Sequence, residues 1–143
     1  MRGVATYLLA ALLLMASCQG GKVRQAQRSA PTASQTITID NAALLNGACD
    51  TLRFGRMRSG EIIAKQVRIE NTSDRALVIT NHNISCGCLS VKYDRKPTQK
   101  GESQTLDIEF DSRTMYGLQL KSLVLHLAQM EQPIRIIVEA EVE

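Results

Sequence analysis

Aromatic residues are scarce in this chain, which has no tryptophan and only 3 tyrosines and 2 phenylalanines among 143 residues. So few rings cannot form the stacking surfaces on which proteins hold unpaired bases or sugar rings. Charge of one sign is not in excess either, with 17 Lys and Arg against 14 Asp and Glu, whereas nucleic-acid binding needs clustered basic charge. Composition therefore predicts no nucleic-acid partner.

The motifs of the common enzyme classes are also missing. The sequence has no Gly-x-Ser-x-Gly, no glycine-rich phosphate loop and no pair of histidines at the spacing of a zinc-binding helix. Asp107, Glu109 and Asp111 alternate along one segment, without the loop spacing and glycine of a calcium site. We expect a non-enzymatic protein with no catalytic residue, no cofactor and no small-molecule substrate.

The N-terminus carries the longest apolar run. Arg2 precedes the nearly all-apolar stretch 4–15, which is too short to cross about 30 Å of hydrocarbon as a helix and is typical of a signal peptide, here 1–17. The following residues Met15-Ala16-Ser17-Cys18 resemble the lipobox of bacterial lipoproteins. That resemblance implies cleavage before Cys18 and attachment of lipid to its thiol and new amino group.

A polar segment separates this signal from the rest of the chain. Residues 18–35 contain one large aliphatic side chain, Val23, so they cannot offset the entropy cost of folding. We predict a flexible linker with a reach of roughly 20–25 Å. Gln19 stands where inner-membrane lipoproteins of the enterobacterial type have Asp, which by resemblance implies the outer membrane, with the domain facing the periplasm.

From residue 36 to 143 the hydrophobic pattern has a period of two. Alternation of this kind predicts half-buried strands, and turn residues separate the segments. The clearest segments are 67–70, 77–80, 89–94, 106–111, 123–127 and 134–139. A helix over 118–130 is disfavoured because Leu123, Leu125 and Leu127 alternate. Short strands at this spacing predict an antiparallel β-sandwich of about seven strands.

Several short motifs in this part resemble one bacterial family. In order they are Phe54-Gly55, Asn71-Thr72, Ser85-Cys86-Gly87-Cys88 and Asp111-Ser112, and they look like the family called domain of unknown function 1573 over about residues 52–142. Lys100 and Leu89 depart from the family pattern, which has Pro and Thr there. The resemblance implies an immunoglobulin-like domain of a kind that binds or scaffolds other proteins.

With Cys18 lipidated, three cysteines remain, and an odd number leaves at least one unpaired within the chain. Cys86 and Cys88 lie on one face if extended, about 6.5 Å apart, so a disulfide between them requires a turn at Gly87. A bond from Cys49 to either one closes about 38 residues and is worth roughly 4 kcal/mol. The residues leave the pairing open, whereas the family resemblance points to the Cys86–Cys88 pair.

Two hypotheses of function follow. The leading one is a lipid-anchored cell-envelope module that binds a protein partner by its strands or rim loops, with the cysteine pair serving only the fold. The alternative is a periplasmic thiol-redox protein, or a soft-metal protein that holds Cu(I) through Cys86 and Cys88 with His82 or Cys49 as third ligand. Because the motif lacks a second cysteine pair, we assign no metal site.

Overall fold

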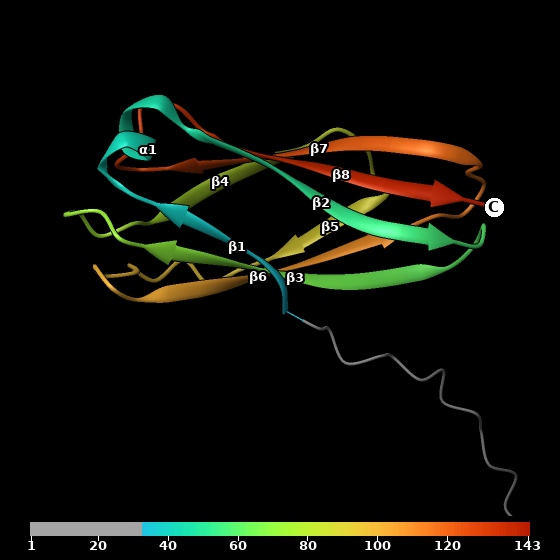
Figure 1. Ribbon diagram of the computed structural model, residues 1–143, viewed down its shortest axis with the longest axis horizontal. Coiled ribbons are helices and arrows are strands. Elements are labelled where there is room, and N and C mark those ends of the chain that lie inside the picture. Colours follow the sequence, from blue (N-terminus) through green and yellow to red (C-terminus); the bar gives the residue numbers. More distant parts are fainter. Residues whose placement is uncertain (1–32) are drawn as a thin grey trace, which may run out of the picture.

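A computed structural model describes residues 33–143 as two four-stranded sheets packed face to face (Figure 1). The strands are β1 (Ala33–Ile39), β2 (Ala48–Met57), β3 (Ile62–Asn71), β4 (Ile79–Ile84), β5 (Leu89–Lys92), β6 (Ser103–Asp111), β7 (Gly117–Leu127) and β8 (Ile134–Val142), with one helix, α1 (Asn41–Asn46). The first sheet has the order β1-β3-β6-β5 and the second β2-β8-β7-β4. The predicted β-sandwich is confirmed. The predicted signal peptide and nearly all of the linker lie outside the described residues.

Each sheet contains one parallel pair, which corrects the expectation of purely antiparallel pairing. β1 runs parallel to β3, and β2 runs parallel to β8, while the other neighbours are antiparallel. Alternation of apolar residues reports which face of a strand is buried and not the direction of its neighbour. The direction is set here by the connection through α1, which carries the chain from an edge of the first sheet to an edge of the second.

The short helix is defined by its two ends. Asp40 precedes it, and the Asp40 carboxylate accepts a hydrogen bond of 2.8 Å from the backbone N–H of Ala43, a common N-cap. Gly47 ends it at φ +77°, and a Cβ atom there would lie 2.7 Å from the carbonyl oxygen of Pro133. A side chain at position 47 is therefore excluded by backbone conformation and by space.

The core lies between the sheets and contains most of the predicted alternating residues, together with buried residues of β1 and β2 that the alternation did not indicate, such as Ile39, Leu52 and Phe54. Phe110, Leu123 and Leu125 are fully buried, and the ring centroids of Phe54 and Phe110 lie 5.7 Å apart. The helical alternative for residues 118–130 is wrong, because this segment forms most of β7.

β4 begins later than the alternation predicts. Leu77 exchanges backbone hydrogen bonds of 2.9 and 2.8 Å with Thr98, so it pairs with the β5–β6 connection before the chain enters β4 at Ile79.

Within residues 33–143, no helix has the length and apolar character needed to cross a membrane.

Candidate interaction surface

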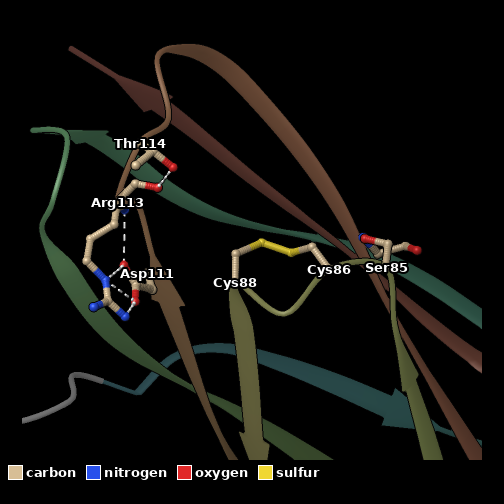
Figure 2. The surroundings of a disulfide bond; sticks show 7 residues. Ser85, Cys86, Cys88, Asp111, Arg113 and Thr114 are labelled. Carbon is tan, nitrogen blue, oxygen red and sulfur yellow. Dashed lines mark hydrogen bonds and ion pairs between the residues drawn. A yellow bond between two sulfur atoms is a disulfide. The ribbon is translucent and has the colours of Figure 1, made fainter.

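The predicted cysteine motif lies where the chain crosses from one sheet to the other. β4 is an edge strand of the second sheet, β5 is an edge strand of the first, and the turn between them holds a disulfide between Cys86 and Cys88 (Figure 2). Gly87 occupies the exposed turn, and the two Cα atoms lie 5.1 Å apart. The backbone N–H of Asp111 donates to the Cys88 carbonyl at 2.9 Å. The disulfide therefore closes a short ring at an inter-sheet corner.

The other predicted members of this site do not join the pair. Cys49 lies on β2, exposed and unpaired, with Arg135 as its neighbour on β8. The ring of His82 contacts Tyr93 instead, with Nδ1 3.1 Å from the hydroxyl oxygen. In the range 33–143, no three His, Cys, Asp or Glu side chains gather as metal ligands. A disulfide also has no thiolate to offer a soft metal.

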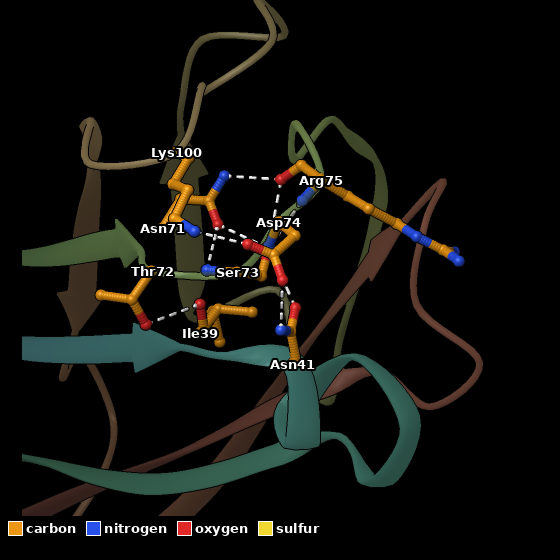
Figure 3. A network of polar contacts seen from close by, with 8 residues as sticks. All are labelled: Ile39, Asn41, Asn71, Thr72, Ser73, Asp74, Arg75 and Lys100. Atoms are coloured by element: carbon orange, nitrogen blue, oxygen red, sulfur yellow. Dashed lines mark hydrogen bonds and ion pairs between the residues drawn. The ribbon is translucent and has the colours of Figure 1, made fainter.

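A buried polar network organises one end of the sandwich (Figure 3). The Asn71 side-chain nitrogen donates to the carbonyls of Arg75 and Thr98 at 2.8 Å each, and its oxygen accepts from the backbone and hydroxyl of Ser73 at 3.0 and 2.7 Å. Asn71 is fully buried, so each of these bonds satisfies a group that water cannot reach. Asn71, quoted above only for its family resemblance, thus holds the β3–β4 connection through Arg75 and the β5–β6 connection through Thr98.

Asp74 adds a surface contact to this network. Its carboxylate accepts hydrogen bonds from Lys100 and from the Asn41 amide, the latter at 2.7 Å. The Lys100 ammonium and then the Asn41 amide hold the pKa of Asp74 below its usual value. These contacts join the start of α1, the β3–β4 connection and the β5–β6 connection. Both oxygens of the Asp74 carboxylate accept hydrogen bonds in them, so the group has a structural role.

Exposed apolar side chains gather on the outer face of the second sheet. Leu118 and Leu120 of β7 are 62% and 57% exposed, and Tyr116 just before the strand is 73% exposed. None of these three residues was among the predicted site residues. A signal was present: in a strand with a period of two, Leu118 and Leu120 cannot share a face with the buried Leu123 and Leu125.

The same part of β7 lacks a neighbour on one side. β4 pairs with β7 from Ile79–Leu127 to Ile84–Leu123, and the last contact is a 2.9 Å bond from the Ser85 N–H to the Ser122 carbonyl. Beyond it, residues 117–121 pair with β8 alone. We call these five residues the open β7 segment.

Solved structures share this fold at low identity. A protein of unknown function from Porphyromonas gingivalis W83 is 21% identical with a TM-score of 0.55, over 64% of this chain and 43% of that one. The VesB protease of Vibrio cholerae is 16% identical with a TM-score of 0.53, over 66% of this chain and 30% of that one. This chain thus spans less than half of either, and the likeness shows the fold alone. No curated protein matches the chain.

The sequence profile of one family covers most of the folded part. The family is described as "Protein of unknown function (DUF1573)", and its profile matches residues 45–142. The match includes the cysteine turn, the Asn71 network and the open β7 segment, and it confirms the resemblance that the motifs indicated. The chain is a member of the DUF1573 family.

Proposed function

We propose that the protein is a lipid-anchored, non-enzymatic module of the bacterial cell envelope that binds a protein partner. The observation that carries the proposal is a cluster of large apolar side chains that are more than half exposed: Leu118 and Leu120 on one face of β7, and Tyr116 just before the strand. Single exposed apolar residues are ordinary on protein surfaces, but adjacent ones are typical of sites that another molecule covers.

The surroundings of the cluster favour a protein as the ligand. Leu118 and Leu120 are flanked in register by Glu141 and Glu139 of β8, so an apolar centre has a charged rim, as protein interfaces commonly do. Leu118 and Leu120 line neither of the two surface pockets beside α1, whereas small-molecule sites are concave. The lipid at Cys18 and the linker 18–35 would hold this face near the membrane.

Cross-linking in native membranes tests this proposal. Membranes from cells that express the wild-type chain are treated with a cleavable lysine-reactive cross-linker, and complexes are isolated and identified by mass spectrometry. We expect a discrete complex that is lost when Leu118→Asp and Leu120→Asp are combined. Thr105→Asp is the matched control because Thr105 is an exposed strand residue of the other sheet, and the complex should persist. A complex that survives both aspartates contradicts the proposal.

Thiol-redox activity is the second candidate, favoured by the disulfide between Cys86 and Cys88, which are both half-buried at a surface turn. A redox role requires that this bond is reduced by two electrons and re-formed during function. Rapid alkylation of intact cells tests it. The interaction module predicts that the pair is fully oxidised at all times, and a substantial reduced fraction in growing cells favours the redox candidate instead.

A further inference from the structure

The backbone of the open β7 segment carries unused hydrogen-bonding groups. The Ser122 carbonyl faces β4, since it accepts from the Ser85 N–H. In an antiparallel sheet the N–H and C=O of one residue point to the same side, and the side alternates along the strand. The backbone groups of Leu120 and Leu118 therefore face the same side of β7 as those of Ser122, which is the side that β4 occupies next to residues 123–127. Nothing in residues 33–143 bonds to them.

The cysteine turn explains why this side is empty. A longer β4 would continue past Ser85 along β7, but the chain turns at Gly87 and enters β5 in the other sheet. The Cys86–Cys88 disulfide holds that turn (Figure 2). The line of β4 is thus interrupted beside the open β7 segment, over a length of about 17 Å at 3.4 Å per residue.

Two of the other edges are capped by side chains. On β2, the N–H of Thr51 donates to the Asp50 carboxylate at 2.7 Å, and the Arg53 carbonyl accepts from the Lys65 ammonium. On β4, the N–H of His82 donates to the side chain of the preceding residue at 2.8 Å. Caps of this kind block strand addition to an edge.

The remaining edges offer less to a partner strand. β5 has four residues, so it is too short for extensive pairing. β1 has an open side, but its exposed side chains Thr36 and Thr38 are polar. The open β7 segment combines free backbone groups with two large exposed apolar side chains on one face, Leu118 and Leu120. The start of β3, before its first β1 partner at Gln66, carries a single large one, Ile62.

Lys121 adds a charge to this segment. By alternation with Leu123 it lies on the inner face of β7, and it is half-buried. It forms no ion pair with any residue in the range 33–143. A half-buried ammonium without a partner gains from an opposite charge placed beside it. A strand that lies next to Lys121 is therefore favoured when it carries an Asp or Glu at the facing position.

We infer that the open β7 segment accepts an extended strand of the protein partner, which takes the line that β4 leaves. Its backbone bonds to Leu118 and Leu120, its outward apolar side chains cover these two leucines, and an inward acidic residue faces Lys121. Strand addition of this type draws affinity from main-chain hydrogen bonds and specificity from alternate side chains. The inference rests on the proposed function and specifies the partner's chemistry.

Photo-cross-linking of the full chain in its native membrane tests this inference. A photoreactive residue replaces Tyr116, adjacent to the segment, and adduct yield is measured in further variants. Leu120→Pro removes an N–H that faces the open side and leaves the bonds to β8 intact. Thr38→Pro is the matched control. The Ile39 carbonyl accepts from the Thr72 N–H, which follows β3, so the backbone groups of the preceding residue, Thr38, point to the opposite, open side of β1. We expect Leu120→Pro to lower the adduct about tenfold and Thr38→Pro to leave it unchanged.

Lys121 gives a test that needs no proline. Lys121→Glu should lower the adduct severalfold, while Lys121→Arg should keep it, because only the first reverses the charge. An adduct that survives both Leu120→Pro and Lys121→Glu overturns strand addition and leaves the proposed function standing. An adduct of twice the chain's mass overturns the partner strand in favour of a second copy. No adduct in any variant contradicts the proposed function itself.

Discussion

The Nδ1 atom of His82 lies 3.1 Å from the hydroxyl oxygen of Tyr93, and the two rings meet edge to face with centroids 5.5 Å apart. His82 belongs to β4 of the second sheet, and Tyr93 follows β5 of the first. The contact therefore ties the two sheets together on the side where the cysteine turn also joins them. On this side the two sheets are joined by the disulfide-bonded turn between β4 and β5 and by the hydrogen bond between His82 and Tyr93.

This contact leads to a stability prediction. Tyr93→Phe keeps the ring and removes the hydroxyl, so we expect the free energy of unfolding in urea to fall by about 1 kcal/mol. Tyr116→Phe is the control, because Tyr116 is 73% exposed and its variant should differ from wild type by less than about 0.5 kcal/mol. Equal effects of the two substitutions would show that the inter-sheet bond contributes nothing.

The cysteine pairing predicts a pattern of alkylation. Of Cys49, Cys86 and Cys88, only Cys49 should react in non-reduced protein, and all three after reduction, as measured by peptide mass spectrometry. Because the disulfide closes only three residues, reduction should lower the free energy of unfolding by roughly 1.6 kcal/mol in the loop-entropy model. A peptide that links Cys49 to either of the others would refute the pairing.

Asp74 predicts a dependence of stability on pH. Lys100 and Asn41 hold the pKa of Asp74 in the folded state below the usual 3.8. The stability that the Asp74 carboxylate contributes is therefore fully present above its pKa in the unfolded state, and it is lost as the pH falls through its pKa in the folded state. Asp74→Asn should therefore be less stable than wild type at neutral pH, with the difference closing below about pH 4. Glu131→Gln, a control on the exposed surface, should show no such trend in urea titrations. A difference that is constant with pH would contradict the assignment.

The lipid anchor predicts a change of location. Cys18→Ser removes the attachment point, and the three cations of the linker, Lys22, Arg24 and Arg28, cannot hold the domain at the membrane at physiological salt. We expect the variant to lose labelling by radioactive fatty acid and to move from the membrane to the soluble fraction. Membrane retention of the unlabelled variant would overturn the lipoprotein assignment.

Much of the fold could be predicted because burial leaves a pattern in the sequence. β6 and β8 alternate cleanly, since one face of each packs in the core and the other meets solvent. The parallel pairing of β2 with β8 could not be predicted, because it depends on where α1 redirects the chain. Similarly, three cysteines allow several pairings. The sequence does not show whether the chain turns at Gly87, and this turn is what brings Cys86 and Cys88 close enough to bond.

The candidate surface was harder to predict than the core. Leu118 and Leu120 belong to the same strand as Leu123 and Leu125, and a search for apolar residues does not separate them. The even positions of Leu118 and Leu120, against the odd positions of Leu123 and Leu125, indicate that they point outward. The absence of a strand beside them depends on where β4 ends, which the sequence does not show. The residues could be found from the sequence, whereas the open edge required the structure.

Covalent footprinting is the most direct test of whether a partner covers the open β7 segment, because Leu45 offers a matched exposed site on the same protein. Leu120 and Leu45 are 57% and 59% exposed, so a diffusible carbene or hydroxyl radical should label them at similar rates in purified protein, and the ratio of their labelling is then measured in intact membranes. If a partner covers the segment, Leu120 labelling falls severalfold relative to Leu45 in the membrane and recovers on purification. An unchanged ratio in membranes and in purified protein would contradict a partner on this face.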